Sequence, residues 1–262
     1  MPLLTANGIT IYYEEKGSGE PLVCISGLGA AHDSWTLARE ALARQYRVIT
    51  FDNRGMGQTS APKEPYSIEQ MARDTAALME ALGLASAHIA GQSMGSSIAQ
   101  FMAVRHPQKV RKLLLCNPFK RIREIALFVF RTNARLLREG VPTPLVFEVI
   151  LPWLFSNAFF QDQARVRAMI ELASAQPQQS REAFERQIEA AAAFDSGHLL
   201  KDIGAPTLLV AGSHDIMTPA DEAQDMAKII PNARFEAMPT GHLSIIESPE
   251  AFAKLAARFL LE

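Results

Sequence analysis

Ser93 is the residue of this sequence best placed for chemistry. It stands in the stretch GQSMG, between Gly91 and Gly95. A β-type run, AHIAG, precedes the serine, and a helix-forming run, SSIAQFMAVRH, follows the motif. A sharp strand-to-helix turn exposes a serine hydroxyl as a nucleophile, and flanking glycines let the strand and the helix approach without Cβ clashes. A turn of small residues with a capping serine is the alternative, but this context favours a nucleophile.

Two later residues have the types that a serine nucleophile requires. A base must take the serine proton, and an acid must orient that base. Asp215 lies in SHDIMTP, just after the apolar run APTLLVAG, and His242 lies in a loop before the last predicted helix. Taken singly, Asp215 would serve as a turn residue and His242 as an ordinary loop residue. Together, the order Ser93, Asp215, His242 at successive strand ends predicts a Ser-His-Asp triad.

Acyl transfer also requires N–H donors for the negative charge that develops on the carbonyl oxygen. The backbone N–H of Met94, directly after the nucleophile, is the first expected donor. We expect the second from Leu28, between Gly27 and Gly29, because this loop directly follows the apolar run PLVCI. A flexible glycine turn without a catalytic role is the alternative.

The elements that must position these residues read as an α/β fold. Short apolar runs alternate with amphipathic stretches, which is typical of a mostly parallel central β-sheet flanked by helices. The opening run ITIYYEEKG instead alternates in polarity and predicts antiparallel strands at the sheet edge. The clearest helix spans residues 67–84, with Ser67 as N-cap and Gly83 as its end. The expected parallel strands are PLVCIS (21–26), YRVITF (46–51), AHIAG (87–91), VRKLLLC (110–116) and APTLLVAG (205–212).

The alternation stops after Asn117 and resumes after Lys201. The sequence between them is helical and rich in aromatic residues, it is broken by prolines, and it has no strand signal. We interpret residues 118–201 as a helical cap, or lid, inserted after the sixth strand. Residues 1–117 and 202–262 would then form the core domain.

The composition favours a small-molecule partner. The 262 residues include 26 Lys and Arg against 28 Asp and Glu, so neither a nucleic acid nor a membrane is an expected partner. Both cysteines lie in apolar runs, and no secretion signal or membrane span is evident, so we expect a cytoplasmic protein. The histidines are scattered rather than spaced as ligands, so we expect no metal.

The whole chain outside the cap resembles the α/β-hydrolase fold superfamily, most closely its carboxylesterases and 3-oxoadipate enol-lactonase-like serine hydrolases. This resemblance implies that Ser93, His242 and Asp215 cleave a small carboxylic ester or lactone through an acyl-enzyme, with Leu28 and Met94 as oxyanion donors. It implies no cofactor, and a monomer or a homodimer. The matching segments are SGLGA, FDNRGMGQTS, YSIEQMARDTAALMEALGL, GQSMG, GSHDIMTP and GHLSIIESPEAF.

Two features refine the resemblance. Many members of the superfamily carry His-Gly before the first oxyanion donor, whereas this chain has Ser26-Gly27, which keeps the donor but changes its support. A serine at the nucleophile position argues against a haloalkane dehalogenase, in which the resemblance implies an aspartate. Asp52 and Arg54 match a loop of the superfamily that we assign to the scaffold.

The substrate is less determined by the sequence. Five arginines of the cap would bind a substrate carboxylate, although such charges more often form a solvated helix face; they are Arg121, Arg123, Arg131, Arg135 and Arg138. Three functions remain open: a serine hydrolase of esters or lactones, a carbon–carbon bond hydrolase of aromatic catabolism, and a low-turnover ligand receptor on the same fold. The candidate pocket residues, for most of which helix packing is the alternative role, are His32, Phe128, Trp153 and Phe155.

Overall fold

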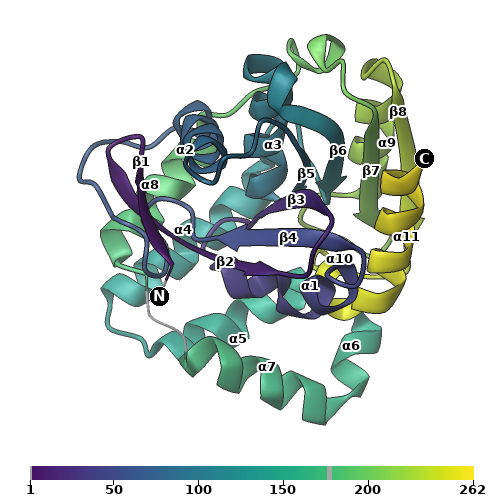
Figure 1. The fold of residues 1–262 in the computed structure, drawn as a ribbon. Helices are drawn as coiled ribbons and strands as arrows, with labels where there is room; N and C mark the ends of the chain where they lie inside the picture. Colours follow the sequence, from purple (N-terminus) through teal and green to yellow (C-terminus); the bar gives the residue numbers. More distant parts are fainter. Residues whose placement is uncertain (1, 176–178) are drawn as a thin grey trace.

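The computed structural model describes residues 2–175 and 179–262. Its described part contains one eight-stranded sheet with the strand order β1-β2-β4-β3-β5-β6-β7-β8 (Figure 1). The expected cap, 118–201, includes residues 176–178, and the expected core begins at residue 1; these four residues lie outside the described ranges. The strands are β1 (Leu3–Ala6), β2 (Ile9–Lys16), β3 (Glu20–Ile25), β4 (Tyr46–Phe51), β5 (Ala87–Gln92), β6 (Val110–Cys116), β7 (Thr207–Gly212) and β8 (Ala233–Met238).

The pairing confirms the expected mostly parallel sheet with an antiparallel start. Strands β1 and β2 pair antiparallel, as do β2 and β4, and the pairs from β4 through β8 are parallel. Every residue of β5 and β7 is buried, because helices cover both faces of the sheet. Strand β8, at the edge, is partly exposed.

Two groups of helices cover the sheet. Buried side chains of α2, α3 and α9 share one apolar cluster with one face, whereas those of α1, α10 and α11 share a second cluster with the other. Helix α2 begins where expected, since Ser67 Oγ accepts a hydrogen bond from the N–H of Gln70. These helices are α1 (Thr36–Leu42), α2 (Ile68–Ala81), α3 (Met94–Arg105), α9 (Ala220–Ile229), α10 (Ser244–Glu247) and α11 (Pro249–Leu261).

The segment between β6 and β7 is helical, and Figure 1 shows α5, α6 and α7 along one side of the molecule. We call α4 to α8 the inserted helices. They comprise α4 (Glu124–Arg138), α5 (Thr143–Leu154), α6 (Asn157–Gln161), α7 (Gln163–Ala175) and α8 (Arg181–Ala192).

A buried ion pair fixes the loop after β4. Arg54 Nε and Nη2 donate to the Asp74 carboxylate of α2 at 2.6 and 2.7 Å, and both side chains are about 3–4% exposed. Asn7 Nδ2 also donates to Asp74, at 2.6 Å. These contacts agree with a scaffold role for this loop.

We expect Asp74→Ala to lower the free energy of unfolding by about 3–5 kcal/mol, because it leaves the Arg54 guanidinium buried without its partner. Urea denaturation followed by circular dichroism measures this change. Glu69→Ala, which removes an exposed carboxylate from the same helix, is the matched control and should change stability by less than about 1 kcal/mol. A loss below about 1 kcal/mol in Asp74→Ala would contradict a structural role for the pair.

Candidate active site

Ser93, Asp215 and His242 each follow a strand of the sheet. Ser93 directly follows β5, Asp215 lies three residues after β7, and His242 lies four residues after β8. Because β5 to β8 are parallel neighbours, their carboxyl ends meet at one edge of the sheet. The topology therefore brings the three loops to the same edge.

Ser93 occupies a strained turn between β5 and α3. Its backbone adopts φ 52° and ψ −120°, a region that residues with side chains rarely occupy. A Cβ on Gly91 would lie 2.2 Å from the Gly95 carbonyl oxygen, and one on Gly95 would lie 2.2 Å from the Ile25 carbonyl oxygen. Only glycine fits these two positions, so the motif's glycines allow β3, β5 and α3 to meet around the serine.

Asp215 and His242 form a buried hydrogen-bonded pair. His242 Nδ1 lies 2.8 Å from Asp215 Oδ2, and the side chains are 3% and 0% exposed. Burial alone would raise the pKa of Asp215, but the charge and hydrogen bond of His242 and the hydrogen bonds from Thr218 outweigh it and lower that pKa. Asp215 is therefore a carboxylate, which favours the His242 tautomer with its proton on Nδ1 and leaves Nε2 as an acceptor.

Two supports of Asp215 were missed in the sequence. Asn117 Nδ2, at the end of β6, donates to Asp215 Oδ2 at 2.9 Å, and Thr218 Oγ1 lies 2.7 Å from the same oxygen. The N–H groups of Met217 and Thr218 donate to Oδ1 at 2.8 and 3.0 Å. The signal for Thr218 was its spacing, since an Asp commonly accepts from N–H groups two and three residues on. Asn117 gave no such signal, because it reaches Asp215 across neighbouring strands.

The loop after β3 lies against Ser93. A Cβ on Gly27 would be 3.3 Å from Ser93 Cβ, so the turn that carries Leu28 borders the serine. Ser26 donates from Oγ to the Ala31 carbonyl at 2.9 Å. The Ser26 carbonyl accepts from Asn53 Nδ2 at 2.9 Å. Ser26 thus supports the turn from inside the loop itself.

The His242 loop is held from two directions. Gln92, directly before Ser93, donates from Nε2 to the His242 carbonyl at 3.3 Å. The Gly241 N–H donates to Glu247 Oε2 at 2.9 Å, and that buried carboxylate also accepts from the N–H and Oγ of Ser156. The serine turn and the histidine loop are therefore linked to each other and to the inserted helices.

A family model described as the alpha/beta hydrolase fold matches residues 20–249. This chain belongs to the alpha/beta hydrolase family. The match spans the Ser93 turn, Asp215 and His242, and it includes the inserted helices.

Named relatives of this alpha/beta hydrolase cover nearly all of its length. A Mycobacterium tuberculosis protein named as the non-heme bromoperoxidase BpoC is 33% identical over 96% of this chain and 97% of its own. An Acinetobacter baylyi protein named 3-oxoadipate enol-lactonase 2 is 29% identical over 95% and 92%. The crystal structure of an enol-lactonase from Burkholderia xenovorans LB400 superposes with a TM-score of 0.90 at 29% identity, covering 100% of both chains. These relatives place the protein among hydrolase enzymes of this fold.

The expected aromatic pocket residues of the hydrolase lie in different surroundings. Phe128 is 72% exposed on α4, so the structure gives no support to a place in an enclosed pocket. Phe155 is buried and stacks on Phe159, with ring centroids 3.9 Å apart, and its backbone packs against Gly241 beside His242. Trp153 is half-buried and packs against the core. Of the three, Phe155 lies directly beside the histidine loop.

His32 is engaged by carboxylates rather than free for a ligand. Its Nδ1 lies 2.8 Å from Asp52 Oδ1, and its Nε2 lies 3.4 Å from Glu14 Oε1. The Tyr12 ring packs against the imidazole at a centroid distance of 4.8 Å. Burial lowers the pKa of His32, but the hydrogen bond and charge of Asp52, with the charge of Glu14, outweigh it and raise that pKa above its ordinary value. These contacts favour a structural role for His32.

The raised pKa of His32 predicts a pH-dependent contribution to stability. Protonated His32 stabilises the folded state because its pKa is higher there than in the unfolded chain. This stabilisation is complete below the ordinary histidine pKa of about 6.5 and is lost as the pH rises through the raised pKa. We therefore expect His32→Gln to lower the free energy of unfolding most near pH 6 and progressively less toward pH 8. Urea titrations at several pH values measure this, with the exposed His198→Gln as control. A deficit that stays constant from pH 6 to 8 would contradict the prediction.

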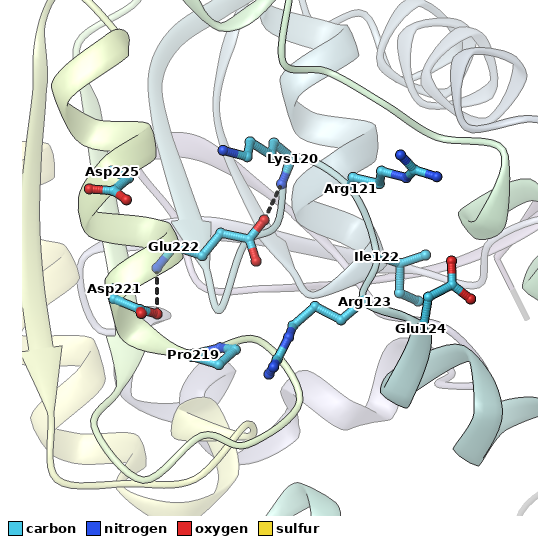
Figure 2. A pocket seen from close by; sticks show the side chains of 9 residues that line it. All are labelled: Lys120, Arg121, Ile122, Arg123, Glu124, Pro219, Asp221, Glu222 and Asp225. Carbon is cyan, nitrogen blue, oxygen red and sulfur yellow. Dashed lines mark hydrogen bonds between the residues drawn. The ribbon is translucent and has the colours of Figure 1, made fainter.

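A surface groove of about 700 Å³ lies between the start of α9 and residues 120–124 (Figure 2), and neither Ser93 nor His242 lines it. The N–H of Lys120 donates to Glu222 Oε1 at 3.2 Å, and Figure 2 shows the Arg121 and Arg123 side chains pointing in different directions. The arginines therefore do not converge on one anion in this groove. Its lining residues are Lys120, Arg121, Ile122, Arg123, Glu124, Pro219, Asp221, Glu222 and Asp225.

Within residues 2–175 and 179–262, no group of three or more His, Cys, Asp or Glu side chains is arranged to hold a metal ion. No helix within the same ranges has both the length and the apolar character needed to cross a bilayer.

Proposed function

We propose that this alpha/beta hydrolase is a serine hydrolase that cleaves a small carboxylic ester or lactone through an acyl-enzyme. The observation that carries the proposal is the 2.8 Å contact between Asp215 Oδ2 and His242 Nδ1, in a loop that Gln92 joins to the Ser93 turn. An ionised, fully hydrogen-bonded acid beside a histidine, next to a strained serine turn, is the arrangement that activates a hydroxyl.

In the proposed reaction, His242 Nε2 takes the proton of Ser93 Oγ as that oxygen bonds to the substrate carbonyl carbon. Asp215 holds His242 in the required tautomer and stabilises the imidazolium that results. The N–H groups of Leu28 and Met94 donate hydrogen bonds to the negatively charged oxygen that was the carbonyl oxygen. Collapse of this intermediate expels the alkoxide, which takes the proton from His242, and water then releases the acid by the same steps.

The substrate class is supported by the named relatives and by the contacts of the inserted segment. The relatives named as enol-lactonases support an ester or lactone bond. Leu154, at the end of α5, accepts a hydrogen bond from the Leu243 N–H, and Ser156, just before α6, shares the Glu247 carboxylate with the Gly241 N–H, as a cap over the site would. We therefore propose that residues 118–201 form the cap and that Phe155 contributes to its inner wall. The carbon–carbon hydrolase and the low-turnover receptor are alternative outcomes of the test below.

A fluorophosphonate probe and a substrate panel test the proposal on the wild-type protein. We expect covalent labelling of Ser93, located by peptide mass spectrometry, and turnover of p-nitrophenyl esters or small lactones. Labelling with turnover of vinylogous diketones alone would favour the carbon–carbon hydrolase. Labelling with no turnover of either class would favour the receptor, and no labelling would reject the serine hydrolase altogether.

A further inference from the structure

A buried glutamine on α8 joins two loops that leave the sheet at the active-site edge. Gln187 is 0% exposed. Its Oε1 accepts a hydrogen bond from the Gly29 N–H at 3.0 Å, in the loop after β3, and its Nε2 donates to the Arg54 carbonyl at 3.1 Å, in the loop after β4. One side-chain amide thus bonds a backbone group on each of two separate loops, and the bond to the Arg54 carbonyl is buried.

Helix α8 packs closely on both loops. Gly29 adopts φ 68°, and a Cβ there would lie 3.0 Å from the Phe184 ring. Gly55 adopts φ 77°, and a Cβ there would lie 3.0 Å from Ala183 Cβ. Because these two positions carry no Cβ, the backbones of both loops can lie close enough to α8 to form hydrogen bonds with the Gln187 amide.

The turn that Gln187 contacts has one long internal hydrogen bond where it borders Ser93, since the Ala30 nitrogen lies 3.4 Å from the Gly27 carbonyl oxygen. Glycines flank Leu28 on both sides, and glycine offers more backbone conformations than any other residue. Ser26 and Asn53 hold the start of this loop. The Gly29 N–H belongs to the peptide unit directly after Leu28, so the bond to Gln187 fixes the other end.

We infer that Gln187 is a positioning residue of the inserted helices, which aims the Leu28 N–H at the developing oxyanion by holding the Leu28–Gly29 peptide. The inference rests on the proposed function, because it needs Leu28 as a donor. Gln187 itself does not touch the substrate. Since an oxyanion donor acts mainly in the transition state, the loss of Gln187 affects acylation and leaves ground-state binding nearly unchanged.

The test compares two buried glutamines that each make two hydrogen bonds. Gln100 of α3 is 2% exposed, donates from Nε2 to the Phe119 carbonyl at 3.2 Å and accepts from Ser196 Oγ at 2.6 Å. Gln100→Met and Gln187→Met therefore remove equivalent interactions, but only Gln187 contacts the loop after β3. Gln187→Asn, which is polar but one methylene shorter, is the second variant if Gln187→Met does not fold.

The readouts separate positioning from a general loss of stability. For a p-nitrophenyl ester, we expect Gln187→Met to lower the single-turnover acylation rate about 10- to 100-fold, with KM changed less than about threefold. Affinity for an alkyl trifluoromethyl ketone should fall similarly, because Ser93 Oγ adds to its carbonyl carbon and leaves a tetrahedral oxyanion while His242 holds the proton. Gln100→Met should keep the wild-type acylation rate and the wild-type affinity for the ketone.

The outcomes that overturn the inference are distinct from failure of the proposed function. Acylation within threefold of wild type in the Gln187 variants, or an equal loss in Gln100→Met, would overturn it while leaving the serine hydrolase intact. A rise in KM alone would also overturn it. A wild-type protein that neither labels with fluorophosphonate nor hydrolyses the panel would instead reject the proposed function, and the inference with it.

Discussion

We expect Ser93→Ala to abolish fluorophosphonate labelling and to lower kcat for a p-nitrophenyl ester by about 10⁴- to 10⁶-fold. Without Oγ no acyl-enzyme can form, and only binding and the oxyanion donors remain to assist attack by water. The free energy of unfolding should change by less than about 1 kcal/mol, because alanine has the same Cβ at the strained φ of 52°. Active-site titration and urea denaturation measure the two effects.

Ser97→Ala is the matched control for this substitution. Ser97 is one turn further along α3 and is fully buried, and its Oγ has no hydrogen-bond partner among the described residues. It should label at the wild-type rate. Persistent labelling of Ser93→Ala, or loss of labelling in both variants, would show that the reactive group lies elsewhere.

The second large effect is expected for Asp215→Asn, which should lower the acylation rate about 10⁴-fold, the magnitude known for the equivalent change in another serine hydrolase. An asparagine can still accept from the N–H groups of Met217 and Thr218. Its amide nitrogen, which is a donor, would however take the place of Oδ2, which accepts from His242 Nδ1 and from Asn117 Nδ2 in the wild-type protein. A donor would then face two donors. The histidine then adopts the other tautomer, with its proton on the nitrogen that should receive the serine proton.

Asp215→Asn should also lower the free energy of unfolding. The pKa of Asp215 is lowered in the folded protein, so its carboxylate stabilises the fold above the ordinary aspartate value of about 3.9, and this contribution is lost as the pH falls. Asp215→Asn should cost about 1–3 kcal/mol at pH 7. The exposed Asp221→Asn is the control. Near-wild-type acylation in Asp215→Asn would assign the orienting acid to another residue.

Much of the fold could be predicted because the signals are local. Runs such as APTLLVAG are apolar on both faces and became buried parallel strands, and the glycines around Ser93 mark a turn that no other residue can make. The strand-like runs that precede Ser93, Asp215 and His242 in the sequence predicted that all three lie just after strands. Each of these inferences needed only neighbours in the sequence.

The remaining site contacts join distant segments, and local patterns do not encode them. Asn117 meets Asp215 across 98 positions, and Gln187 meets Gly29 across 158.

The orientation of α4 could not be predicted from the sequence either. In an apolar stretch, Phe128 and Phe130 are two residues apart and so lie on different faces of the helix, and only packing decides which one is buried. The structure buries Phe130 and exposes Phe128.

The hydrogen bonds between the inserted helices and the catalytic loops bear on how this enzyme can be re-engineered. Leu154 and Ser156 hold the histidine loop, and Gln187 holds the glycine turn beside the nucleophile. A chimera that exchanges residues 118–201 for the corresponding helices of another family member would therefore change turnover together with substrate range. Under the proposed function, we expect grafts that retain these three residues to separate the two traits, and grafts that omit them to lose turnover for reasons unrelated to their new pocket.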